Sequence, residues 1–172
     1  GTMFLSAVHG NLGSFFLESR DSERALEHFQ MAVEWSGELL GVGHPDFALD
    51  LNNLGNALLY FGEHSEAIVH LRESVSCLTE TFGDQNPNSV VALKNLAWAL
   101  EDSGDYEAAY PLHQRALDGM LRYLERELPT LSEAGRLRFL EVSGNPESLL
   151  YCLSRMDAPS MLEPYASFSR WK

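Results

Sequence analysis

The stretch "DLNNLGNALLYFGEHSEA", residues 50–67, combines apolar residues at helical spacing with a glycine turn and the start of a second helix. Leu51, Leu54 and Leu58 share one face of the first helix, because successive residues turn by about 100°. Gly62 suits the left-handed conformation that often ends a helix. The stretch therefore predicts two helices joined by a tight turn.

The same pattern occurs three times at one spacing. The triplet Asn-Leu-Gly at residues 53–55 matches residues 11–13, and Asn-Leu-Ala at residues 95–97 follows 42 residues later. Small residues and prolines share this period, at Ala25, Ala67 and Ala109 and at Pro45, Pro87 and Pro129. A common period of several features indicates internal repeats. We predict three units, at about residues 4–44, 45–86 and 87–128.

Each unit is predicted to hold two helices. Polar or glycine-bearing turns at residues 19–21, 61–63 and 103–105 end the first helix. The second helices are expected to begin near Ser22, Ser65 and Tyr106 and to end near Leu40, Phe82 and Leu124. The alanines allow the two helices to approach closely, and proline suits the first turn of the next helix.

These motifs resemble the tetratricopeptide repeat family. Its pattern W-x2-L-G-x2-Y, followed by A-x3-F, occurs in the second unit as Leu51-x2-Leu54-Gly55-x2-Leu58 and Ala67-x3-Leu71. The longer period and the Gly-His-Pro-Asp turn at residues 43–46 are similar to the kinesin light chain subtype, although residues 128–130 lack that turn in the third unit. The resemblance implies an all-α, right-handed solenoid of helical hairpins.

The period breaks after residue 128. The positions equivalent to the triplet, 137–139, hold Leu-Arg-Phe, and Tyr151 replaces the alanine. One interpretation is that residues 129–172 form degenerate helices that cap the array. Alternatively, residues 128–141 and 165–172 resemble the region before a caspase-like CHAT protease domain in bacterial proteins. The chain would then be the regulatory, partner-sensing part of a protease whose catalytic domain lies beyond Lys172.

Residues 1–3, Gly-Thr-Met, resemble an expression scar, and we expect the chain to be a fragment of a longer protein. Its 25 acidic and 12 basic residues give a net charge of −13, which disfavours nucleic acid and favours a neutral or basic partner. No apolar run reaches the roughly 18 residues of a membrane span. Cys77 and Cys152 match no metal spacing, and buried free thiols are typical of the cytoplasm.

No catalytic or cofactor motif is recognisable. The six histidines include no H-E-x-x-H motif and no pair four residues apart, and neither cysteine belongs to a nucleophile motif. The glycines form no phosphate-binding loop. The sequence therefore predicts a binding protein that is not an enzyme and holds no metal or cofactor.

Asparagine is a poor helix former, yet Asn52, Asn53 and Asn56 lie in one predicted helix. On a helical wheel they share a face with Tyr60, away from the leucines. The family resemblance implies that this face lines the concave groove of the array. An amide both donates and accepts hydrogen bonds, so it can pair with the backbone of an extended peptide.

The candidate groove residues are Asn11, Ser14, Asn52, Asn53, Asn56, Tyr60, Lys94, Asn95 and Trp98. For the three asparagines at one repeat position (11, 53 and 95), ligand binding and bracing between helices are equally open. For Asn52 and Asn56, binding is favoured. A carboxylate clamp of the chaperone-binding type is disfavoured, because Gly10 and Ser14 stand at its positions. The predicted partner is an extended protein segment or peptide, and self-association stays open.

Overall fold

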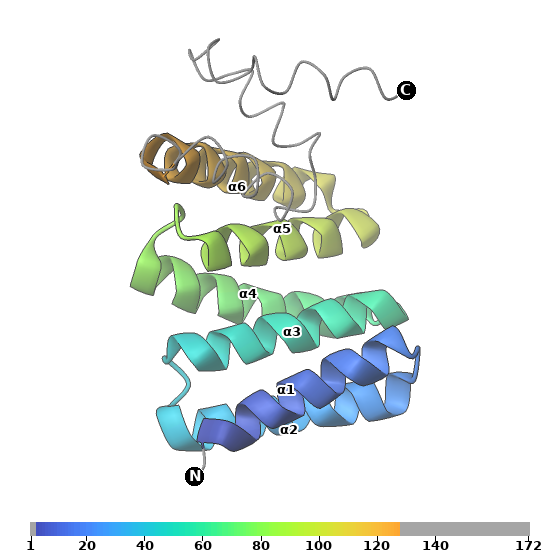
Figure 1. The fold of residues 1–172 in the computed structure, drawn as a ribbon. Coiled ribbons are helices and arrows are strands. Elements are labelled where there is room, and N and C mark those ends of the chain that lie inside the picture. The colour runs from blue at the N-terminus through green and yellow to red at the C-terminus, as the bar shows by residue number, and fades with distance from the viewer. Residues whose placement is uncertain (1–2, 128–172) are drawn as a thin grey trace, which may run out of the picture.

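The computed structural model describes residues 3–127, which form six α-helices in three stacked pairs (Figure 1). The pairs are α1 (Met3–Glu18) with α2 (Ser22–Leu40), α3 (Pro45–Phe61) with α4 (His64–Phe82), and α5 (Pro87–Asp102) with α6 (Tyr106–Glu127). The predicted capping helices and the region that resembles the approach to a CHAT domain lie outside the described residues.

The 42-residue period is kept in the backbone. The first helices begin at residues 3, 45 and 87, and the second helices begin at residues 22, 64 and 106. No strand occurs between residues 3 and 127. The all-α fold of paired helices is therefore confirmed for this part of the chain.

The helix ends follow the local sequence. Pro45 and Pro87 lie in the first turns of α3 and α5. The His44 side chain accepts a hydrogen bond from the Asp46 N–H at 3.1 Å and so caps α3. Gly62 ends α3 with a φ of 88°, which glycine adopts without steric cost.

The pairs pack closely because small residues lie where the helices meet. A Cβ added at Gly55 of α3 would lie 2.6 Å from Leu71 Cγ of α4, and one added at Gly13 of α1 would lie 2.8 Å from a ring carbon of Phe29 of α2. Ala67, on the facing side of α4, is fully buried. Each helix packs against the next one in the chain, and α3 also contacts α1 and α5.

Candidate functional site

The exposed side of α1, α3 and α5, here called the first-helix face, carries most of the predicted groove residues. The structure places at the surface Asn11 and Ser14 of α1, Asn53, Asn56 and Tyr60 of α3, and Trp98 of α5. Lys94 of α5 is half-buried. The repeat register gives Ser14, Asn56 and Trp98 one position in successive units, so this position changes from polar to aromatic along the array.

Asn52 and Asn95 are used inside the fold. Asn95 Nδ2 donates a hydrogen bond to Asn52 Oδ1 at 3.0 Å, and the two residues are only 7% and 8% exposed. This bond joins α5 to α3. For Asn95, the sequence left binding and bracing equally open, and this bond is bracing. For Asn52, the sequence favoured ligand binding, whereas in the structure its side chain braces two helices.

Asn53 differs from Asn95 although both occupy the same repeat position. On α1, the residue equivalent to Asn52 is Gly10, which has no side chain that could accept a hydrogen bond from Asn53. The Asn53 side chain therefore stays exposed. The same asparagine thus serves bracing in one unit and is presented to solvent in another, because one neighbouring residue changes.

Two of the predicted groove residues are exposed aromatic rings. Trp98 is 48% exposed and Tyr60 is 55% exposed. Lys94 Nζ lies 5.2 Å from the centre of the Trp98 ring, within range of a cation–π interaction. Such half-exposed rings offer apolar area to a partner at little cost in side-chain entropy.

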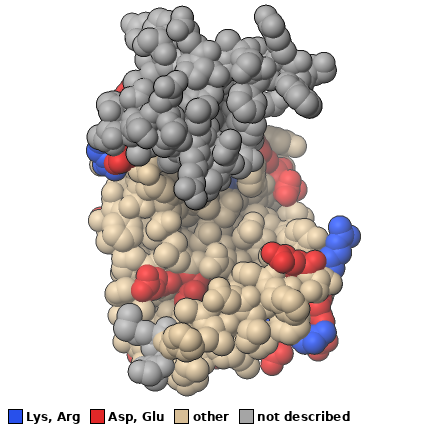
Figure 2. Space-filling model, viewed as in Figure 1, with Lys and Arg blue, Asp and Glu red and all other residues tan. Residues whose placement is uncertain are grey.

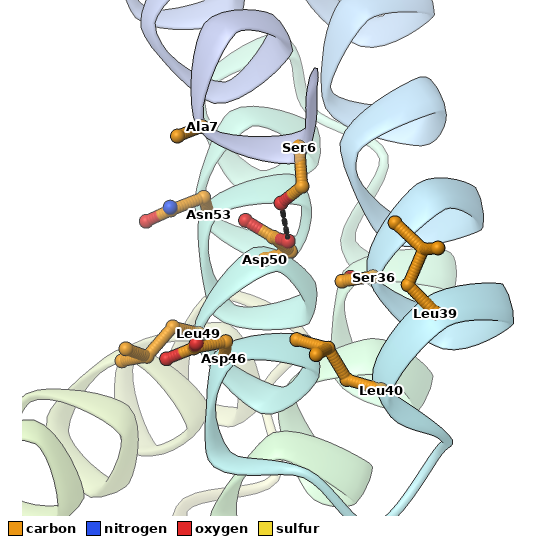
Figure 3. A pocket seen from close by; sticks show the side chains of 9 residues that line it. All are labelled: Ser6, Ala7, Ser36, Leu39, Leu40, Asp46, Leu49, Asp50 and Asn53. Atoms are coloured by element: carbon orange, nitrogen blue, oxygen red, sulfur yellow. Dashed lines mark hydrogen bonds between the residues drawn. The ribbon is translucent and has the colours of Figure 1, made fainter. Parts of the chain in front are cut away.

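A pocket of about 360 Å³ lies between the first two pairs (Figure 3). Its lining residues are Ser6 and Ala7 of α1, Ser36, Leu39 and Leu40 of α2, and Asp46, Leu49, Asp50 and Asn53 of α3. Ser6 Oγ donates a hydrogen bond to Asp50 Oδ2 at 2.6 Å. Sequence reasoning missed this pocket, although the spacing of Asp46, Asp50 and Asn53 by four and three residues was a signal that they share a helix face.

A histidine pair was also missed. His9 Nδ1 of α1 lies 2.9 Å from His28 Nδ1 of α2, and His28 stacks on Phe16 with ring centres 5.4 Å apart. His9 stands three residues before Leu12, where the family pattern has tryptophan, and this was the available signal. Among residues 3–127, no three His, Cys, Asp or Glu side chains lie close enough together to hold a metal ion.

The Asp84 carboxyl and the Cys77 thiol have shifted pKa values. Arg115 of α6 donates two hydrogen bonds to the Asp84 carboxylate, at 2.9 and 2.8 Å, and these lower the pKa of Asp84. Burial raises the pKa of the Cys77 thiol, whose Sγ donates to the Gly43 carbonyl at 3.3 Å. A raised thiol pKa is the opposite of what a nucleophilic cysteine needs.

A family model described as tetratricopeptide repeat matches residues 4–80 and 51–122. The chain belongs to the tetratricopeptide repeat family. No sequence among curated proteins matches this tetratricopeptide chain. Within residues 3–127, none of its helices is both long and apolar enough to cross a membrane.

Solved structures support the same fold. The crystal structure of BtubC (BKLC) from P. vanneervenii is 16% identical, has a TM-score of 0.67, and aligns over 100% of this chain and 67% of that one. The crystal structure of a Podosopora anserina putative kinesin light chain with nearly identical TPR-like repeats is 18% identical and has a TM-score of 0.65. It aligns over 94% of this chain and 82% of that one. The resemblance to kinesin light chain repeats is thus confirmed for the fold. Nothing in these matches supports the CHAT resemblance.

Proposed function

We propose that this tetratricopeptide array binds an extended segment of a partner protein along its first-helix face. Tetratricopeptide repeats are generally protein–protein interaction modules. The observation that carries the proposal is Trp98, a large apolar ring left 48% exposed on α5. Exposed amides of Asn53 and Asn56 on α3 supply donors and acceptors for a peptide backbone beside it.

The ring of Trp98 would act as the anchor of the complex. Buried aromatic side chains dominate binding energy at protein interfaces, and truncating one typically costs about 2 kcal/mol or more. Lys94, which lies over the ring, would hold it in one orientation. The amides would then set the register of the bound backbone, each contributing about 0.5–1.5 kcal/mol.

The test is a display selection of random decapeptides on the whole chain, followed by calorimetry with an enriched peptide. We expect Trp98→Ala to weaken binding by about thirtyfold or more. Tyr106→Ala is the matched control, because Tyr106 is an exposed aromatic residue of α6 outside the first-helix face. It should leave affinity and melting temperature unchanged.

Equal affinities for the Trp98 variant and the wild type, with helicity preserved in both, would contradict the proposal. Binding without catalysis, in the cytoplasm, belongs to the same proposal. A purified chain that cleaved peptides or hydrolysed nucleotides would contradict that part.

A further inference from the structure

We propose that the pocket between the first two helix pairs receives a cationic side chain, arginine or lysine, of the bound partner. The inference rests on the proposed function, because it assumes a segment lying along the first-helix face. It adds a side-chain preference and a place for it. Four features of the pocket carry the inference: its charge, its apolar wall, the amide at its rim and the glycine beside it.

The described part of the pocket carries negative charge. Asp46 and Asp50 lie one turn apart on α3, and among residues 3–127 no lysine or arginine lines the pocket. Figure 2 shows acidic atoms over the first turns of α3, and none of the described residues next to them on this face is drawn as basic. His44 Nδ1 lies 3.8 Å from Asp46 Oδ2, but this nitrogen accepts the Asp46 N–H and so carries no proton to donate.

The opposite wall of the pocket suits the stem of a basic side chain. Leu39 and Leu40 of α2 line that side, and Leu40 points toward α3 (Figure 3). Lysine and arginine carry several methylene groups below the charged head, and these pack on apolar surface while the head reaches polar groups. A pocket of about 360 Å³ admits one such side chain. A short acidic or amide side chain has too few methylene groups to pack against the leucines.

Hydrogen bonding at the pocket favours a donor over an acceptor. Ser6 already donates to one oxygen of Asp50, so this carboxylate is held in position. A guanidinium or ammonium group could donate to the second oxygen of Asp50, in a charge-assisted bond about twice as strong as a neutral one, while Asp46 adds negative charge one turn away. The Asn53 amide at the rim would hold the partner's backbone beside that side chain.

Gly10 lies beside Asp50 of the pocket. A Cβ at this position would lie 4.0 Å from Asp50 Oδ1, so a longer side chain here could extend to that carboxylate. The equivalent positions hold Asn52 and Lys94 in the next two units. Only the first unit leaves this position empty, which assigns the cationic subsite to the boundary between the first and second pairs.

The probe is the same random decapeptide library, selected on the whole chain. We expect enriched peptides to share a basic residue at one position. Replacing an arginine there by citrulline, which keeps the shape and removes the charge, should weaken binding by about tenfold. The double variant Asp46→Asn/Asp50→Asn should lose affinity for the arginine peptide by a similar factor and none for the citrulline peptide.

The matched control is Glu23→Gln/Glu27→Gln, which removes the same charge from exposed positions of α2 that do not line the pocket. It should leave the affinity unchanged, and thermal melts should show all variants folded. Enriched peptides without a basic position, or equal losses in the control, would overturn the subsite. If Trp98→Ala still abolished their binding, the proposed function would stand. A library with no enriched peptide would overturn both.

Discussion

The boundary between the second and third pairs is closed, whereas the boundary between the first and second pairs is open at the equivalent positions. At the upper boundary of Figure 1, Asn95 bonds to Asn52 between α5 and α3. At the lower boundary, the position equivalent to Asn52 holds Gly10, and a pocket lined in part by Asn53 remains. The helices follow one period in both places, so the difference comes from single side chains.

The connecting turns show the same contrast. The turn between α4 and α5 is held by the Asp84–Arg115 pair, and a Cβ added at Gly119 of α6 would lie only 2.1 Å from the Asp84 carbonyl oxygen. The equivalent residues of the preceding unit are Val42, Glu73 and Cys77, which line a hollow of about 240 Å³. A repeat thus preserves its backbone while a few residues decide how tightly neighbouring pairs join.

The largest effect should come from breaking the upper boundary at its closest approach. Gly119→Ala would force the Asp84 carbonyl away, and overpacking of this kind costs about 1–3 kcal/mol. Gly10→Ala is the control, since its Cβ would meet nothing closer than 4.0 Å. It should stabilise the chain by about 0.5–1 kcal/mol through helix propensity. Urea titrations followed by circular dichroism measure both, and a neutral Gly119→Ala would refute the tight contact.

The hydrogen bond between Asn95 and Asn52 can be removed at the upper boundary and introduced at the lower one. Asn52→Ala leaves the buried Asn95 amide without its partner, which should cost about 1–3 kcal/mol. Asn53→Ala, at an exposed position, should change stability by less than about 0.5 kcal/mol. A smaller effect for Asn52 than for Asn53 would contradict the bracing role.

Gly10→Asn is designed to introduce the equivalent hydrogen bond at the lower boundary, because it places an amide at the repeat position of Asn52. Because asparagine is a poorer helix former than alanine, the bond is measured as the part of the stability difference between Gly10→Asn and Gly10→Ala that depends on Asn53. This excess should be about 0.5–1.5 kcal/mol and should vanish in the Asn53→Ala background. An excess that persisted there would mean that the gain has another origin.

The smallest effect concerns acid. Arg115 lowers the pKa of Asp84 below its usual value of 3.8, so the stabilisation is complete above about pH 4 and disappears as the pH falls through the lowered pKa. Both side chains are partly exposed, so solvent screening limits the effect to a few tenths of a kcal/mol. Arg115→Gln should therefore lower stability more at pH 7 than at an acid pH well below 3.8. An equal loss at both pH values would indicate lost packing instead.

Most of the fold was predictable because the 42-residue period fixes where helices begin, and Ser22 and Tyr106 start helices as expected. The site was predictable only in part. A helical wheel groups Asn52, Asn53 and Asn56 on one side, but it cannot show which of them meets a neighbouring unit. That depends on pairs such as Asn52 with Asn95, which are 43 positions apart.

The nearest-neighbour packing of the helices also bears on how the chain folds. Since each helix touches mainly the next ones along the chain, no long loop must close before contacts form, and formation is expected to be fast. The α1/α2 pair is joined to the rest of the described array mainly through α3, so it could detach as a unit. The α1/α2 pair carries one wall of the pocket, so a ligand bound there would hold this pair against α3. Docking of the pair would then depend on whether the partner is present.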